Sequence, residues 1–100
     1  MRRHAPLACL LILLAGCGGP SAEQRENRKA FEYLLTAVSL KNAKELEKDA
    51  RRIEKRHAAG RLSDSRLRDL QKIIEKARAG NWGEAERMAY EFREAQPFFE

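Results

Sequence analysis

The chain contains few of the residues on which catalytic and metal sites depend. Its 100 residues include two cysteines, two histidines, one tryptophan and three prolines. No cluster of histidine and cysteine has metal-ligand spacing, and no glycine-rich phosphate loop follows a strand pattern. Acidic residues share helix faces with basic ones, as Glu47 does with Arg51, which favours surface pairing over acid–base catalysis. We therefore expect no enzymatic activity, no metal ion and no cofactor.

The sequence also lacks an apolar run long enough to span a membrane. Its one extended uncharged run covers residues 6 to 15, "PLACLLILLA", and follows the basic start "MRRH". A transmembrane helix needs about 20 apolar residues. A short basic segment, an apolar segment of about ten residues and then small residues are typical of a secretory signal peptide. We expect residues 1 to 16 to be that signal peptide.

The end of this segment carries a family resemblance. Leu14, Ala15, Gly16 and Cys17 resemble the lipobox of bacterial lipoproteins, in which small residues precede an essential cysteine. The resemblance implies cleavage between Gly16 and Cys17 and attachment of a diacylglyceryl group to the thiol of Cys17. Acylation of the new amine is also implied. The alternative is a general signal peptide that contains a cysteine by chance.

Removal of the signal peptide changes the composition of the chain. Cys9 leaves with it, so the mature chain would have no disulfide, and loss of Arg2 and Arg3 lowers the formal charge from +5 to +3. We expect residues 17 to 22 to be the lipidated cysteine and a short flexible tether, and residues 23 to 100 to be a small helical domain. Gly18 stands where an Asp commonly marks inner-membrane retention in this family. The resemblance therefore implies the periplasmic side of an outer membrane, where the cell has one.

Capping and breaker residues divide the rest of the chain into helices. Ser21 and Gln24 fit a capping box, and Asn42 with Glu45 fits another. Gly60 and Gly80 are expected to end helices, while Ser63 or Asp64 and Asn81 are expected to begin them. These signals predict an all-α fold with four helices at about 22–40, 43–58, 64–79 and 82–95.

The four helices contain an internal repeat. The register that aligns Asn42 with Asn81 also places the apolar residues of the first helix on those of the third. In the same register Ala50 falls on Ala89 and Ile53 falls on Phe92. We infer two tandem αα-hairpins.

The second hairpin resembles a known repeat family. Gly80, Trp82, Ala85, Ala89 and Phe92 are similar to the turn and second helix of a tetratricopeptide repeat. Upstream the sequence departs from that pattern, since Asp69, Lys72 and Lys76 occupy positions that are usually large and apolar or glycine. The resemblance covers only the stretch from Ala77 to Phe92 and implies a helical-hairpin architecture that binds proteins without catalysis.

Two surfaces are candidates for binding. A basic ridge on the second helix consists of Lys41, Lys44, Lys48, Arg51, Arg52 and Lys55. The apolar face opposite is predicted to hold Ala43, Leu46, Ala50, Ile53 and His57, with Glu45, Glu47, Asp49 and Glu54 flanking the ridge. The ridge could contact anionic lipid or an acidic partner, and it could equally be a solvated face. Interleaved acids and export both argue against nucleic acid.

The second candidate surface consists of aromatic residues near the C-terminus. Tyr90 is predicted to be exposed on the last helix, and Phe98 and Phe99 follow Pro97. The two phenylalanines could cover the edge of the last hairpin or anchor a partner. Together these features predict a membrane-anchored envelope lipoprotein that acts as a non-catalytic protein-binding or assembly module. The alternative is a structural surface protein whose basic ridge contacts anionic lipid.

Overall fold

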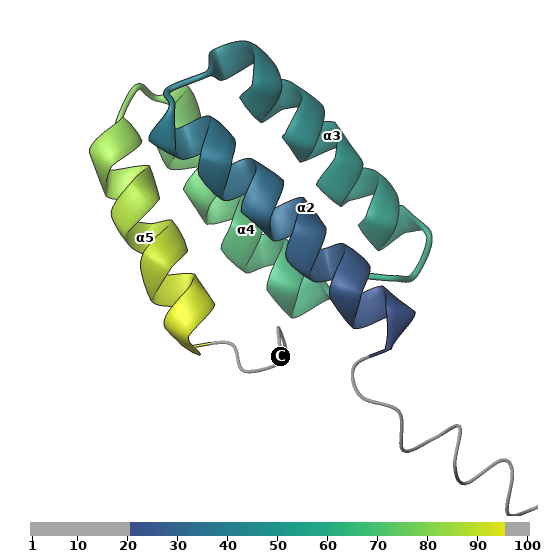
Figure 1. Cartoon of the computed structure of the whole chain (residues 1–100). Helices are drawn as coiled ribbons and strands as arrows, with labels where there is room; N and C mark the ends of the chain where they lie inside the picture. Colours follow the sequence, from purple (N-terminus) through teal and green to yellow (C-terminus); the bar gives the residue numbers. More distant parts are fainter. Residues whose placement is uncertain (1–20, 96–100) are drawn as a thin grey trace, which may run out of the picture.

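A computed structural model describes residues 21 to 95, which form four α-helices and, within that range, no strand. The helices are α2 (Ala22–Ser39), α3 (Ala43–Ala58), α4 (Asp64–Arg78) and α5 (Trp82–Ala95) (Figure 1). The predicted all-α fold of two αα-hairpins is confirmed. Each predicted boundary agrees to within one residue. The predicted signal peptide, residues 1 to 16, and most of the predicted tether lie outside the described residues.

Three of the helices, α2, α3 and α4, begin at predicted caps. Ser21 and Gln24 form the reciprocal capping box, with each backbone amide donating to the other residue's side chain. The side-chain oxygen of Asn42 accepts from the amide of Glu45 at 3.0 Å. Ser63, rather than Asp64, caps α4 by accepting from the amide of Arg66 at 3.2 Å. Each cap satisfies an amide that has no partner within its helix.

Three turns of the same type end α2, α3 and α4. In each turn one residue adopts a left-handed backbone conformation: Lys41 at φ 54°, Gly60 at 76° and Gly80 at 86°. The amide of the next residue then donates to a carbonyl five positions upstream, at 2.9 Å in every turn. Glycine adopts this conformation without steric cost, whereas a residue with a side chain does not. Lys41 is therefore the strained member of the three.

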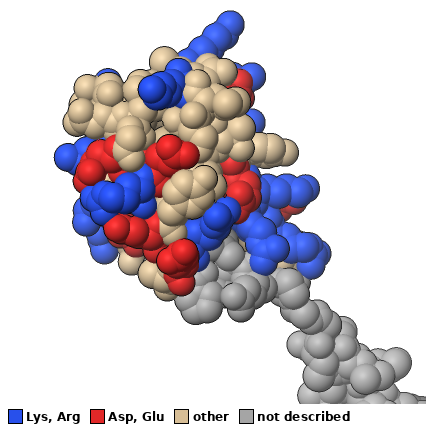
Figure 2. All heavy atoms as spheres, turned by 60° about the vertical axis from the view of Figure 1, so that its left-hand side comes forward, with Lys and Arg blue, Asp and Glu red and all other residues tan. Residues whose placement is uncertain are grey.

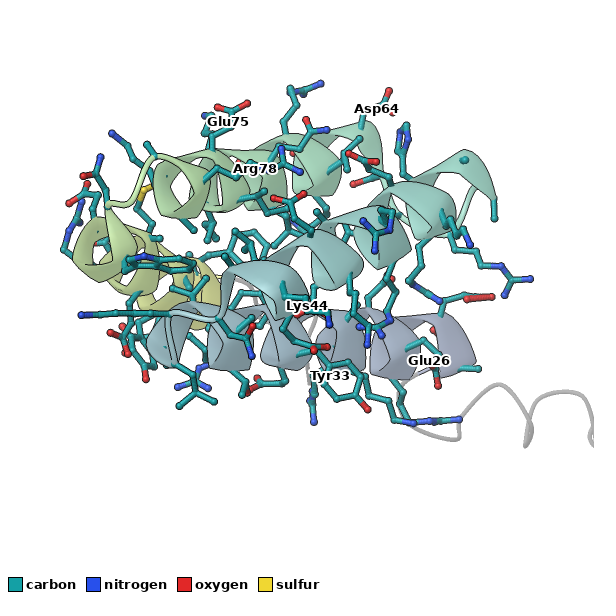
Figure 3. All side chains as sticks on the ribbon, turned by 90° about the horizontal axis from the view of Figure 1, so that it is seen from above. Glu26, Tyr33, Lys44, Asp64, Glu75 and Arg78 are labelled. Carbon is teal, nitrogen blue, oxygen red and sulfur yellow. The ribbon has the colours of Figure 1, made fainter. Side chains whose placement is uncertain are left out.

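The two hairpins pack into a ring of four helices. Helix α2 packs against α3 and α5, and α4 packs against the same two helices. Figure 3 shows this from above, with Glu26 and Tyr33 of α2 on one side of the bundle. Asp64, Glu75 and Arg78 of α4 lie on the opposite side. Between α2 and α5, the aromatic rings of Phe31 and Phe92 pack with their centroids 5.3 Å apart. The first and last helices thus enclose a common core.

The repeated apolar positions fill this core. Four apolar residues of α2 are buried, and so are the four residues of α4 that align with them. In α2 they are Phe31, Leu34, Leu35 and Val38, and in α4, in the same order, Leu70, Ile73, Ile74 and Ala77. The equivalent positions of α3 and α5 are also buried: Leu46 aligns with Ala85, Ala50 with Ala89, and Ile53 with Phe92. The predicted repeat is therefore present in the packing of the core.

Two predictions for α3 are wrong. Asp49 was expected beside the exposed basic ridge but is 1% exposed, because it lies three residues after Leu46 and four before Ile53, in the buried stripe. Ala43 was expected on the buried face but is exposed, because it lies in the first turn, where the helix begins outside the core. His57, at the other end of that face, is half-buried.

A basic groove along α3

An open groove of about 520 Å³ runs along α3 and is the candidate functional site. We define this basic groove by its lining residues: Lys48, Arg51, Arg52, Lys55, Arg56, Ala59 and Arg61. Four of the six residues of the predicted basic ridge lie along it. Lys41 and Lys44 are exposed nearer the start of α3 and do not line it. Arg56 and Arg61, which sequence reasoning missed, take part in it instead.

Two residues near the start of α2 hold one end of the groove in place. The side-chain oxygen of Asn27 accepts from Arg56 Nε at 2.8 Å, and its amide nitrogen donates to the carbonyl of Arg61 at 3.1 Å. Glu23 accepts from Arg61 Nη1 at 3.1 Å. These contacts join α2 to the end of α3 and to the following turn. They hold Arg56 against the surface, with only 16% of its side chain exposed.

The positive charges of the groove are only partly compensated. Within the described residues, three carboxylates pair with lining residues. Glu45 pairs with Lys48 at 3.9 Å, and Asp49 pairs with Arg52. Glu23 pairs with Arg56 and Arg61 at the end of the groove that α2 holds, which we call the fixed end. Neither Arg51 nor Lys55 forms an ion pair with any residue in this range. Six cations therefore face three carboxylates, which leaves an excess of positive charge.

Arg56 also retains a donor with no acceptor. Its Nη2 is buried from solvent, and among the described residues no acceptor lies within hydrogen-bonding distance of it. Glu23 Oε1 lies 3.7 Å away, which is close enough for electrostatic attraction but too far for a hydrogen bond. This donor is closed to solvent, so the feature of the groove that suits an anionic ligand is its unpaired exposed charge on Arg51 and Lys55.

The middle of the groove is held by the buried Asp49. Its Oδ1 accepts from Arg52 Nη1 at 2.6 Å, and the Arg52 guanidinium lies 5.1 Å from the centre of the Tyr33 ring on α2. Oδ2 of Asp49 is buried and has no hydrogen-bond partner among the residues described. Burial raises the pKa of Asp49, an effect only partly offset by Arg52. This carboxylate orients Arg52 at a cost in stability.

Two acids predicted to flank the ridge lie near α4 instead of the groove. Glu47 accepts two hydrogen bonds from Arg78, from Nε and Nη2, each at 2.8 Å. This hydrogen bonding lowers the pKa of Glu47, and Glu54 adds to the negative potential that raises the pKa of Arg78. Both acids therefore interact with Arg78 of α4, although the charge of Glu47 also acts on Arg51 of the groove.

A histidine and an aspartate form a contact at the α3–α4 turn. His57 Nε2 and Asp64 Oδ1 are 2.6 Å apart, and this hydrogen bond lowers the pKa of Asp64. The contact links the end of α3 to the start of α4. His57 is thus engaged in joining two helices.

The outer face of α5 has a different character. Tyr90 is 41% exposed, and the Arg93 guanidinium lies 5.1 Å from its ring centre. Arg87 pairs with Glu84 and Glu91 on the same helix, and Arg93 lies 3.6 Å from Glu32 of α2. Figure 2, which brings the α5 side forward, shows acidic and basic side chains interleaved there. This face is charged but nearly balanced.

Gly16, Cys17, Phe98 and Phe99 lie outside the described residues. Among the residues that are described, no group of three or more His, Cys, Asp or Glu side chains could hold a metal ion. In the same range no helix is both long and apolar enough to cross a bilayer.

The comparisons with known proteins give no match for this chain. No protein-family model matches it, and neither a curated protein nor a solved structure is significantly similar to it.

Proposed function

We propose that the chain is a bacterial envelope lipoprotein, anchored by lipid on Cys17, whose helical domain is a non-catalytic protein-binding or assembly module. The observation that carries the proposal is the Leu14-Ala15-Gly16-Cys17 sequence behind a basic start and a short apolar run. The placement of the fold supports it, because α2 begins at Ala22, shortly after Cys17. Two or more acyl chains on Cys17 would hold the domain stably at a membrane. Because Gly18 stands where an Asp commonly marks inner-membrane retention in lipoproteins, the proposal favours the periplasmic side of an outer membrane if the organism has one.

The anchor is tested by Cys17→Ser in cells fed a clickable palmitate analogue. We expect the wild-type chain to be labelled and processed, and the variant to be unlabelled and to accumulate as precursor. Cys9→Ser is the matched control, because it removes the other cysteine and should leave labelling intact. Normal processing of Cys17→Ser to a soluble product would contradict the anchor.

Binding of a protein partner is supported by the exposed aromatic residue on α5. Tyr90 lies on a face that is charged but nearly balanced, and aromatic side chains contribute strongly to interfaces. A photo-crosslinking amino acid at position 90 should yield one dominant adduct in cells. The same substitution at Tyr33, which is also exposed and lies under an arginine, is the control. Identical adduct patterns at both positions would argue against a specific surface on α5.

A further inference from the structure

We propose that the basic groove binds the phosphate of an anionic phospholipid headgroup and so forms a second contact between the domain and its membrane. The proposal rests on the proposed function in one respect, namely that the lipid anchor on Cys17 brings the domain to a membrane. Arg51 and Lys55, one helical turn apart, offer charge that forms no ion pair with a described residue. Arg56 and Arg61 add positive charge at the end of the groove, where Glu23 pairs with both of them. A phosphodiester supplies the negative charge and the oxygen acceptors that the exposed side chains of Arg51 and Lys55 lack.

The position of the groove favours lipid over other anions. Its fixed end is bound to Glu23 and Asn27, in the first two turns of α2. Glu23 lies close after Cys17 in the sequence, and the extended chain between them spans at most about 22 Å. A lipidated Cys17 therefore keeps this end of the groove within reach of the headgroup layer. The local concentration of headgroups there far exceeds that of a soluble acidic peptide or free phosphate.

Glu23 limits the affinity of the groove. It is the one described carboxylate that contacts both arginines of the fixed end, at 3.7 Å from Arg56 and 3.1 Å from Arg61. It would also stand close to a bound phosphate and repel it. Neutralising Glu23 should therefore strengthen binding, whereas neutralising an acid on the far side of the bundle should not.

The experiment uses the mature chain from residue 17 with Cys17→Ser, so that binding does not depend on acylation. This chain keeps the whole described core, which lies between Ala30 and Phe92. Co-sedimentation is measured with vesicles of phosphatidylethanolamine, with and without phosphatidylglycerol. We expect binding only to the anionic vesicles and release by about 0.5 M salt, where the Debye length falls to about 4 Å.

Charge-matched variants locate the binding surface. Arg51→Gln with Lys55→Gln should weaken partitioning about thirty-fold, because each basic residue at the surface contributes about fivefold. Lys72→Gln with Lys76→Gln removes the same charge, at the same spacing, from the exposed face of α4 and should change it less than about threefold. Glu23→Gln should strengthen binding about fivefold, and Glu75→Gln on α4 is its control.

Three results would overturn the proposal. One is an absence of sedimentation with anionic vesicles at low salt. Another is equal loss in the two double variants, which would show attraction by net charge alone. The third is binding of a polyglutamate peptide through Arg51 and Lys55 without binding to vesicles, which would identify an acidic protein as the ligand. Lipid labelling at Cys17 is measured separately, so failure of the groove and failure of the anchor are distinguishable.

Discussion

The two hairpins share their backbone and their buried positions but present different surfaces. The register that aligns Asn42 with Asn81 carries four residues of the basic groove, Lys48, Arg51, Arg52 and Lys55, onto Arg87, Tyr90, Glu91 and Glu94. The first set is entirely cationic, whereas the second contains one cation, one aromatic residue and two acids. The comparison shows that the core positions define the hairpin while the exposed positions are free to diverge. The difference in surface charge between the hairpins therefore lies in their second helices, α3 and α5.

The cores of the hairpins also differ in how they distribute volume. Leu46 and Ile53 of α3 correspond to the smaller Ala85 and the larger Phe92 of α5. Asp49 and Lys41 correspond to Met88 and Gly80, so the buried charge and the strained turn both belong to the first hairpin. Replacing residues of the first hairpin by their counterparts tests which differences matter for stability.

Leu46→Ala should have the largest effect. The side chain is 1% exposed, and its truncation leaves a cavity that α3 cannot close, so the free energy of unfolding should fall by about 3 kcal/mol. Urea unfolding followed by far-UV circular dichroism measures the change. The reverse exchange, Ala85→Leu, should cost about 1–3 kcal/mol by overpacking. Little effect from either would mean that the surrounding core relaxes to accommodate the change in volume.

Asp49→Met should raise the free energy of unfolding at neutral pH by about 1 kcal/mol, because it removes a buried carboxylate with an unsatisfied oxygen. Arg52 remains solvated, since 42% of its side chain is exposed. The raised pKa of Asp49 means that the folded chain takes up its proton more readily than the unfolded chain. The wild-type penalty is therefore full at neutral pH and relieved as the pH falls through the raised pKa.

Urea unfolding across this pH range checks the prediction. The advantage of Asp49→Met over the wild type should shrink on acidification, and Asp49→Asn isolates the effect of the charge. Destabilisation by both substitutions at neutral pH would show that the pair with Arg52 is net favourable.

Lys41→Gly should stabilise the chain by about 1 kcal/mol, because glycine removes the strain of a side chain at positive φ. Its counterpart change, Gly80→Ala, should destabilise by a similar amount. Thermal unfolding of both variants measures the pair. Equal and opposite shifts are expected, and a loss in Lys41→Gly would indicate that the side chain of Lys41 contributes more than its strain.

Arg78→Ala should have the smallest effect, a loss of about 0.5 kcal/mol, because Arg78 and Glu47 are each nearly half exposed. Hydrogen bonding lowers the pKa of Glu47, so this stabilisation is present at neutral pH and lost as the pH falls through that lowered value. Added salt should reduce the difference from wild type. An effect above that of Leu46→Ala would be inconsistent with a solvent-exposed pair.

The sequence predicts the helices well because local signals determine where they start and stop. Ser21, Asn42 and Ser63 satisfy amides of their own helices, and Gly60 and Gly80 supply left-handed turns, so no long-range information is needed. The apolar spacing likewise identifies the core. The same spacing places Asp49 in the buried stripe, a signal that its charge obscured.

The groove required information that one helix cannot supply. Arg51 and Lys55 are recognisable as surface cations from the spacing of α3 alone. Arg56 and Arg61 join them only because Asn27 and Glu23 of the preceding helix, α2, bind them. Likewise, Glu47 binds Arg78 of α4 instead of pairing with the basic ridge of its own helix. Contacts between helices therefore decide which charges remain unpaired.

The contact between Phe31 and Phe92 has a consequence for the order of folding. Each hairpin joins helices that are adjacent in sequence, whereas the seam between α2 and α5 joins the two ends of the described chain. Bringing distant segments together costs more loop entropy than closing a short turn. We expect the seam to form late, so that Phe92→Leu mainly accelerates unfolding in stopped-flow measurements while changes in the turns alter the folding rate. We thus expect the contact between α2 and α5 to form last during folding and to break first during unfolding.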